Sequence, residues 1–361
     1  MLRSRRHFMA GATIAVGLPA LSGCARGADP AYTRIAAELR APLPASAALA
    51  DLVRYATLAP NGHNTQPWRF LARVGGISVV PDFSRRTPIV DPDDHHLWVS
   101  LGCAVENLLI AAAARGQAGA VAMREGAGGV DIELITAAPS EDGLFAAIPL
   151  RQSTRSTYES KAVSADSLTT LQASASDKSV DLRLFTSSPD RDRILDFVVQ
   201  GNTAQMDDPA FVAELLQWIR FDPDTAIAKA DGLFSACSGS PTLPDWLGRR
   251  LFSLVFRKQG ENDKYAEHVR SSSGVAVFTG ASETPADWFQ VGRSFQRFAL
   301  RATALGLRHA HINQPIEVPE VRRDFAQWVG VGSARPDLVV RFGYAPAMPM
   351  SLRRRMSVET G

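Results

Sequence analysis

Two apolar helical segments, residues 97–114 and 285–305, are related by a constant offset of 190 positions, and this repeat limits the folds open to the chain. Each segment follows a turn that contains Asp and Trp and ends on Gly, as a complete helix commonly does. The identities at this offset pair Trp98 with Trp288, Gly102 with Gly292, Ala112 with Ala302, Ala114 with Ala304 and Gly116 with Gly306. A duplicated unit of one long helix and short strands favours an α+β fold, with two related halves packed about a pseudo-two-fold axis.

The boundary between the two halves is expected near residues 137–143, where a strand-like pattern gives way to Pro, Ser, Asp and Gly. This assigns residues 42–140 to the first half and residues 141–361 to the second. Periodicity in the second half predicts strands near residues 180–185, 274–279, 309–312 and 338–342, and helices near residues 190–205, 209–219, 246–256, 285–305 and 319–328. Residues 222–247 fit neither repeat and are predicted to be either a lid over a bound group or a plain packing loop.

A proline-bounded loop at residues 59–70 connects an apolar helical segment to an alternating, strand-like segment. Pro60 is expected to end the helix, Asn61 and Gly62 to form a turn, and Pro67 to hold Gln66 extended. Such a loop presents backbone and side-chain amides beside an indole, which suits a flat polar ring with donors and acceptors. The same residues also suit a plain turn whose Trp fills a core.

The string P-x-x-x-N-x-Q-P-W-x-F in this loop resembles the signature of the nitroreductase superfamily, whose members hold FMN at a subunit interface. The longer form H-N-T-Q-P-W-R-F is most similar to the Acg-like branch, in which two halves are fused in one chain. The resemblance implies a nitroreductase-like α+β fold with FMN as cofactor. It implies that the flavin-binding loop residues are Pro60, Asn61, Gly62, Asn64 and Gln66.

Residues 151–155, Arg-Gln-Ser-Thr-Arg, place two guanidinium groups four positions apart with a hydroxyl between them. This pattern suits a terminal phosphate, although an isolated copy also fits a basic, solvated turn. It resembles the family motif R-x-S-x-[KR]. The resemblance implies that Arg151, Ser153 and Arg155 hold the FMN phosphate and that Gln152 lies near the ring.

Two later segments resemble the remaining parts of such a site. The basic residues Arg353 and Arg354 are similar to a C-terminal pair that returns to the phosphate in this family. Pro315, Ile316 and Glu317 resemble the segment that crosses the flavin edge near N5. Glu317 equally suits the first turn of a helix, where the helix dipole favours an acid.

The loop motif occurs only in the first half and the phosphate motif only in the second, so the chain carries the parts of one site. We therefore expect one FMN between the halves of a monomer that is an internal pseudo-dimer. The chemistry implied is two-electron transfer from NAD(P)H, or another small-molecule donor, to a nitroaromatic, quinone or similar acceptor. The alternatives are a flavin-storage protein closed by the lid and a scaffold without flavin. No side chain is identified as a catalytic acid or base.

The first 27 residues resemble an export signal and are excluded from the fold. Arg5 and Arg6 precede an apolar run that is shorter than the roughly 20 residues of a membrane span. The pair resembles a twin-arginine signal, and Leu-Ser-Gly-Cys resembles a lipobox with Cys24 as the lipidated residue. Residues 28–41 are predicted to be a tether, so the expected location is the periplasmic or cell-surface side of a membrane.

Charge and motif content argue against several other classes of protein. From Cys24 onward the chain has 36 basic and 37 acidic residues, which gives no general attraction to nucleic acid. The sequence contains no dinucleotide-binding, Walker or nucleophile-elbow motif. The histidine pairs at residues 95–96 and 309–311 are not expected to bind metal. Cys103 and Cys237 are expected to be free thiols.

Overall fold

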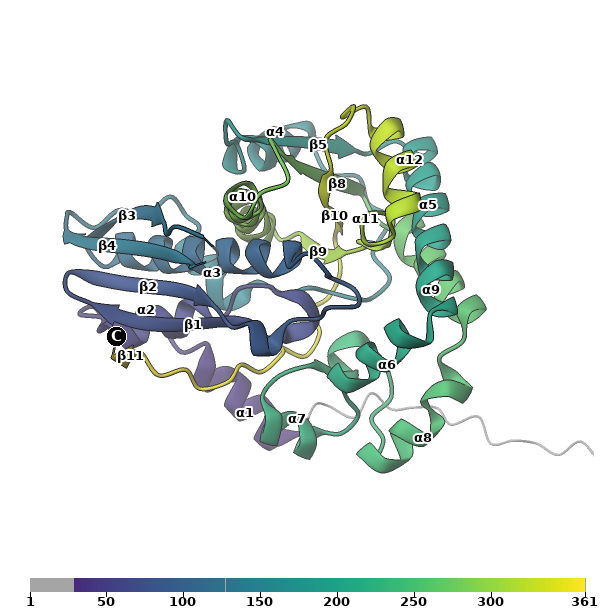
Figure 1. Cartoon of the computed structure of the whole chain (residues 1–361), viewed down its shortest axis with the longest axis horizontal. Helices are drawn as coiled ribbons and strands as arrows, with labels where there is room; N and C mark the ends of the chain where they lie inside the picture. The colour runs from purple at the N-terminus through teal and green to yellow at the C-terminus, as the bar shows by residue number, and fades with distance from the viewer. Residues whose placement is uncertain (1–28, 127, 361) are drawn as a thin grey trace, which may run out of the picture.

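The computed structural model describes residues 29–126 and 128–360, and these form two antiparallel sheets with long helices between them (Figure 1). This confirms the expected α+β class. The predicted export signal and the lipidation site at Cys24 lie outside the described residues.

The two main sheets share one strand order. The first has the order β11-β1-β2-β4-β3 and the second β5-β8-β10-β9. Leaving out β11, which adds to the edge of the first sheet parallel to β1, every pairing is antiparallel and both orders read first-second-fourth-third. The strands are β1 (Trp68–Arg73), β2 (Gly76–Pro81), β3 (Gln117–Met123), β4 (Val130–Thr136), β5 (Val180–Phe185), β8 (Gly274–Gly280), β9 (Arg308–His311), β10 (Pro336–Gly343) and β11 (Glu359–Thr360).

A long helix connects the second and third strands of each sheet: α3 (His95–Ala114) and α10 (Pro285–Ala304). Helix α10 begins with the Thr284 side chain accepting from the backbone of Asp287, followed by Pro285 in its first turn. At the start of α3, the Asp91 carboxylate accepts from the backbone N–H groups of His96 and Leu97. Both helices are followed by a glycine with positive φ, as their sequences predict.

The two helices cross at Gly102 and Gly292. A Cβ on Gly102 would lie 2.1 Å from the carbonyl oxygen of Phe289, and one on Gly292 would lie 2.0 Å from that of Val99. Val99 and Phe289 are themselves separated by the repeat offset of 190, so the contact is reciprocal. Only glycine allows the two backbones to approach this closely.

Two polar pairs beside this crossing have the same reciprocity. Glu106 pairs with Arg297 at 3.0 Å, and Asn107 accepts a hydrogen bond from Gln296 at 2.6 Å. At the offset of 190, Glu106 corresponds to Gln296 and Asn107 corresponds to Arg297. Each residue of α3 therefore pairs with the counterpart of its neighbour. Both pairs are partly or fully buried, so they fix the register of α3 against α10.

Helix α3 is long and apolar enough to cross a membrane. In the structure, 89% of its most apolar stretch is buried inside the fold. It therefore acts as the core helix that the first sheet, α2 and α10 pack against.

The other elements complete the two layers and a peripheral group. They are α1 (Pro30–Leu39), α2 (Leu49–Ala56), α4 (Ala165–Ser174), α5 (Ser188–Asp207), α6 (Pro209–Trp218), β6 (Ile219–Arg220), α7 (Pro223–Lys229), β7 (Leu233–Phe234), α8 (Asp245–Val255), α9 (Lys258–Arg270), α11 (Gln314–Glu317) and α12 (Pro319–Val329). The strands and helices predicted for the second half are confirmed to within a few residues, whereas α4, α7 and α9 were not predicted. Helices α6, α7 and α8 gather along the lower edge of Figure 1, away from both sheets.

The predicted tether is wrong for most of its length, because α1 occupies it. Asp29 caps this helix and Pro30 stands in its first turn. Tyr32 is 1% exposed and donates to the Met350 carbonyl at 3.0 Å. The cap and the helical spacing of Tyr32 and Ala36 are local signals that the low overall hydrophobicity of this stretch concealed.

Candidate functional site

A cavity of about 530 Å³ lies where the two halves of the chain meet. This volume is within the range of roughly 300–1,000 Å³ that is typical of small-molecule sites. The first half contributes the loop that begins at Pro60 and the N-terminal part of α3. The second half contributes Arg155, residues of α5, α6, α8 and α9, and the segment from His311 to Glu317.

Five of the residues predicted from the sequence line this cavity: Pro60, Asn61, Gly62, Arg155 and Glu317. The other predicted residues lie outside its lining: Asn64, Gln66, Arg151, Gln152, Ser153, Pro315, Ile316, Arg353 and Arg354.

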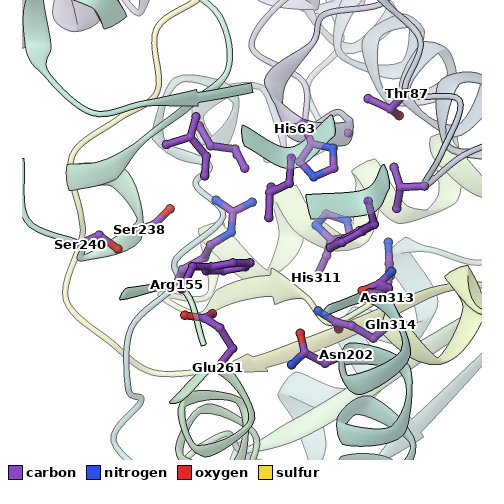
Figure 2. A pocket seen from close by; sticks show the side chains of 18 of the residues that line it. His63, Thr87, Arg155, Asn202, Ser238, Ser240, Glu261, His311, Asn313 and Gln314 are labelled. Atoms are coloured by element: carbon purple, nitrogen blue, oxygen red, sulfur yellow. The ribbon is translucent and has the colours of Figure 1, made fainter. Parts of the chain in front are cut away.

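Arg155 is the central cation of the cavity. Figure 2 shows its side chain between Ser238 on one side and the imidazoles of His63 and His311 on the other. Within the described part of the chain, its guanidinium forms no hydrogen bond and no ion pair, although Glu261 lines the same cavity. Burial lowers the pKa of Arg155, but a guanidinium keeps its proton in proteins. A partly buried cation without a counter-ion is costly, so this position favours a bound anion.

Arg151 lies behind the cavity and is also incompletely paired. Its Nη2 donates to the Leu58 carbonyl at 2.8 Å, while its buried Nε and Nη1 have no partner. Burial lowers the pKa of Arg151 to about 10. Ser153 pairs through its backbone with His309 in an isolated parallel bridge. The motif at residues 151–155 is therefore extended rather than helical.

Gln152, Arg353 and Arg354 act as structural residues in this conformation. Gln152 donates to the Pro349 carbonyl at 3.2 Å and accepts from the Met348 N–H at 2.7 Å. The Arg353 Nε donates to the Thr57 carbonyl at 2.7 Å, and its Nη2 donates to the Ala59 carbonyl at 3.1 Å.

Arg353 thereby satisfies carbonyl groups of the turn that follows α2. Arg354 donates to the Gln66 carbonyl at 2.9 Å. Both arginines hold the C-terminal segment against this turn and the loop. That one of them contacts a phosphate stays a prediction.

The loop has a different backbone from the predicted one. Asn61 is extended, and positive φ occurs at His63, Asn64 and Gln66, with values of 46°, 55° and 55°. The prediction that Pro67 holds Gln66 extended is therefore wrong. Tertiary hydrogen bonds stabilise the strained conformation: Gln66 N–H donates to the Asn61 side chain at 2.8 Å, and the Gln66 side chain donates to Ala230 at 2.9 Å.

Asn64 is directed into the protein rather than into the cavity. Its Nδ2 donates to the carbonyl groups of Gly232 and Leu352, at 3.0 and 3.2 Å. The turn at residues 62–64 instead brings His63 to the cavity wall. Of the loop residues predicted to contact the ring, Pro60, Asn61 and Gly62 line the cavity, and His63 lines it as well.

Glu317 belongs to an ionic pair in the cavity wall. It accepts from the Gln205 side chain at 2.7 Å and lies 3.4 Å from the His96 Nε2. Burial alone would lower the pKa of His96, but contact with Glu317 and Asp91 raises it above its ordinary value. Burial would raise the pKa of Glu317, but contact with His96 lowers it. The pair therefore favours the protonated form of His96.

The other two histidines of the cavity are neutral. Burial lowers the pKa of His63 to about 4 and that of His311 to about 3, and the nearby Arg155 acts in the same direction. A neutral imidazole offers one donor and one acceptor. The polar wall therefore combines the cations Arg155 and Lys264, the His96 imidazole paired with Glu317, and two neutral imidazoles.

The opposite wall is apolar and comes from the peripheral helices. Its large side chains are Phe211, Leu215, Ile219, Phe221, Leu243, Leu251, Phe252, Val255 and Phe256. The rings of Phe252 and Phe256 stack with centroids 4.6 Å apart. Part of the predicted lid, residues 233–243, lies in this wall together with three serines, Ser235, Ser238 and Ser240.

Sequence reasoning missed most of this lining. His63 stands inside the loop motif and could have been included on that ground. His96 and His311 were considered only as metal ligands, and the aromatic wall has no local signal because its members are ordinary core residues in sequence.

Among residues 29–126 and 128–360, no group of three or more His, Cys, Asp or Glu side chains is placed to hold a metal ion. His95 is turned away from the cavity, with its Nε2 2.9 Å from the Asp337 carboxylate. The rings of His309 and His311 are 6.5 Å apart. The described cysteines, Cys103 and Cys237, are buried and free.

No protein-family model matches the chain. It is 24% identical over 319 residues to a provisionally named NAD(P)H nitroreductase of Mycobacterium tuberculosis, which covers 84% of this chain and 88% of that protein. It is 25% identical over 328 residues to an uncharacterized protein of the same organism, which covers 85% of this chain and 90% of that protein. The first similarity supports the nitroreductase superfamily, which the motifs also indicate.

Solved structures give a weaker similarity. A nitroreductase from Anabaena variabilis shares 9% identity and a TM-score of 0.38, over 86% of this chain and 91% of that chain. An FMN-bound nitroreductase from Bacteroides fragilis shares 16% identity and a TM-score of 0.36, over 57% of this chain and 90% of that chain.

Proposed function

We propose that this chain, which is similar along most of its length to a protein of the nitroreductase superfamily, is an FMN-dependent oxidoreductase. The observation that carries the proposal is the unpaired Arg155 in a cavity of about 530 Å³ that both halves of the chain line. When bound, FMN supplies two-electron transfer between a nicotinamide or other donor and a small nitroaromatic, quinone or similar acceptor.

The residues present fit a phosphorylated, ring-shaped cofactor. Arg155 and Lys264, with the hydroxyl groups of Ser235 and Ser238, would hold the phosphate. Arg151 lies behind them with two buried nitrogen atoms that lack partners. The loop residues Pro60, Asn61 and Gly62 would lie along the ring, and the backbone N–H groups of the segment that ends at Glu317 would lie at its edge.

The His96 and Glu317 pair would provide the proton that a reduced acceptor requires. Glu317 favours the charged form of the imidazole, and Gln205 fixes the second carboxylate oxygen. Since the His96 and Glu317 side chains both line the cavity, the His96 Nε2 or Nδ1 atom could give its proton directly to an acceptor bound there. His63 and His311 would then orient the acceptor as neutral hydrogen-bonding groups.

In this proposal the two halves arose by duplication and form one site in a monomer, as in the Acg-like branch. The shared strand order of the two sheets supports this relation. The reciprocal contacts at Gly102 and Gly292 support it as well, because a two-fold axis pairs each residue with the repeat of its partner. Residues 222–247 would act as a lid, since part of this segment lines the cavity.

The proposal also includes export and a lipid anchor at Cys24 on the periplasmic or cell-surface side of a membrane. The twin-arginine pattern and the lipobox support this location, and both are sequence features alone. Twin-arginine export of a folded protein would let the chain bind FMN in the cytoplasm. NAD(P)H is scarce outside the cytoplasm, so the alternative electron donor is another small molecule.

Titration of the protein with FMN, followed by quenching of flavin fluorescence, tests the site. Arg155→Gln should weaken FMN binding by about ten- to a hundredfold, because a hydrogen bond from a charged donor contributes roughly 1.5–3 kcal/mol. Arg323→Gln is a matched control, since Arg323 is 81% exposed on α12. Equal FMN affinity of Arg155→Gln and the unmodified protein would contradict the assignment.

An anaerobic absorption spectrum before and after excess NADH or NADPH separates the enzyme from the storage alternative. Rapid bleaching of bound flavin supports the reductase. If dithionite reduces the flavin and neither nicotinamide does, a storage protein or a different donor replaces that reading. A protein that stays colourless after reconstitution rules out both.

A further inference from the structure

Helix α8 carries large apolar side chains on the surface of the protein. Trp246, Leu254 and Val255 are 64%, 59% and 74% exposed. The inner side of the helix is already packed, with Phe252 buried and Gly248 against the ring of Phe221. A surface helix of a globular protein normally places polar residues on its outer side, so this exposed apolar surface indicates an interaction site.

The same helix and its C-terminal extension are basic. Residues 245–258 contain four basic residues, Arg249, Arg250, Arg257 and Lys258, and one acid, Asp245. Arg249 pairs with Asp245 at 2.6 Å and Lys258 with Asp207 at 2.7 Å. In the part of the chain that the structure describes, Arg250 and Arg257 form no ion pair.

Exposed Trp and Leu interleaved with free arginines are the pattern of a helix that lies in a membrane interface. The arginine stems can extend along apolar surface while their head groups reach lipid phosphates. An apolar protein partner would leave the two free positive charges without counter-charges, whereas an anionic lipid surface supplies them.

Helix α8 also borders the cavity. Val255, at its C-terminal end, is both largely exposed and part of the cavity lining, beside Leu251 and Phe256. Val255 follows Trp246 by nine positions, which places the two side chains on opposite sides of the helix. The side that carries Trp246 and Leu254 therefore faces away from the cavity.

The N-terminal end of the described chain lies on the same side of the molecule. Tyr32 of α1 packs against Phe234 at 4.6 Å between ring centroids, and Leu233, beside Phe234 in β7, lines the same cavity as α8. Helices α1, α7 and α8 lie along the lower edge of Figure 1. Asp29 follows Cys24 by five positions, and such a stretch reaches at most about 18 Å. A lipid anchor at Cys24 would hold this edge close to a membrane.

We propose that α8 docks into the surface of an anionic lipid bilayer, with Trp246 and Leu254 inserted among the lipids and Arg250 and Arg257 at their phosphates. This docking does not depend on bound flavin, so its failure and the failure of the proposed function are distinguishable.

Co-sedimentation with vesicles of phosphatidylcholine, with and without phosphatidylglycerol, tests the docking. The full chain carries Cys24→Ser throughout, so that lipid attachment contributes nothing. We expect binding that increases with phosphatidylglycerol and weakens with salt. Trp246→Ser with Leu254→Ser should weaken binding about a hundredfold, at about tenfold for each large side chain removed from lipid. Arg250→Gln with Arg257→Gln should weaken it by about fivefold per charge.

The matched control is Ile135→Ser with Leu150→Ser, which removes two apolar side chains of similar exposure, 57% and 58%, from other surfaces. This control should bind vesicles like the parent chain. All variants share the N-terminal segment, so the ratio between variant and control isolates α8. Brominated phospholipids should quench the fluorescence of Trp246, and Trp246→Phe should remove that quenched component.

Equal vesicle binding by the α8 variant and the control overturns the proposal, and so does a Trp246 emission that brominated lipid leaves unchanged. A concentration-dependent dimer that α8 substitutions dissociate, without an effect on vesicles, would show that a second copy covers this surface instead. Thermal unfolding of each variant confirms that a change in binding does not arise from misfolding.

Discussion

The crossing of α3 and α10 gives the most direct test of the architecture. Gly102→Ala would place a Cβ 2.1 Å from the Phe289 carbonyl oxygen, and carbon atoms do not approach carbonyl oxygens closer than 3.0 Å. The two helices must therefore separate by about 1 Å, which weakens the packing along their whole contact. Because the obstacle is backbone and cannot rotate away, we expect a loss near the upper end of the overpacking range, about 3 kcal/mol.

The reciprocal geometry makes a second, sharper prediction. Gly292→Ala should cost a similar amount, because its Cβ meets the Val99 carbonyl oxygen at 2.0 Å. The two substitutions together should cost clearly less than their sum, since one separation of the helices relieves both clashes. Gly260→Ala in α9 is the control: its Cβ would meet nothing within 4 Å, so we expect a gain of about 0.5–1 kcal/mol.

Urea unfolding followed by far-ultraviolet circular dichroism measures these differences. Thermal midpoints should fall by about 6 °C for each crossing variant, taking roughly 2 °C per kcal/mol for a chain of this size. Crossing variants as stable as the unmodified protein would refute the close approach of the helices. Strict additivity of the pair would refute the shared contact.

Two further predictions concern buried titratable groups. The pKa values of His63 and His311 are lowered by burial to about 4 and about 3 in the folded protein, against about 6.5 unfolded, so the unfolded chain binds more protons in this window. Stability should be full above pH 6.5 and fall as the pH approaches 4; urea midpoints across this range check it, and midpoints that do not change would contradict it. Burial raises the pKa of both Cys103 and Cys237, so in the native protein both should react with a thiol reagent far more slowly than after unfolding. Rapid reaction of either thiol in the native protein would contradict its burial and show that the structure around it opens to solvent.

Much of the fold follows from signals that act over a few residues. The terminal glycines of α3 and α10, and the short apolar runs that form the strands of the second half, can be recognised in sequence because each depends on neighbouring positions. The predicted tether at residues 28–41 shows where such local signals are insufficient. Residues 30–39 have a cap and helical spacing, but what makes α1 stable is burial of Tyr32 against residues more than 200 positions away.

The candidate site divides in the same way. The motifs identified Pro60, Asn61, Gly62, Arg155 and Glu317, which do line the cavity. They could not show which donors remain free.

Arg353 and Arg155 have the same side chain, yet Arg353 donates to carbonyl groups at the end of a helix nearly 300 positions earlier in the chain, while Arg155 meets only the cavity. A sequence determines which residues can donate, accept or carry charge, since these are properties of single side chains. Only the packing of distant segments decides which of those groups are already paired, and the unpaired ones make the site.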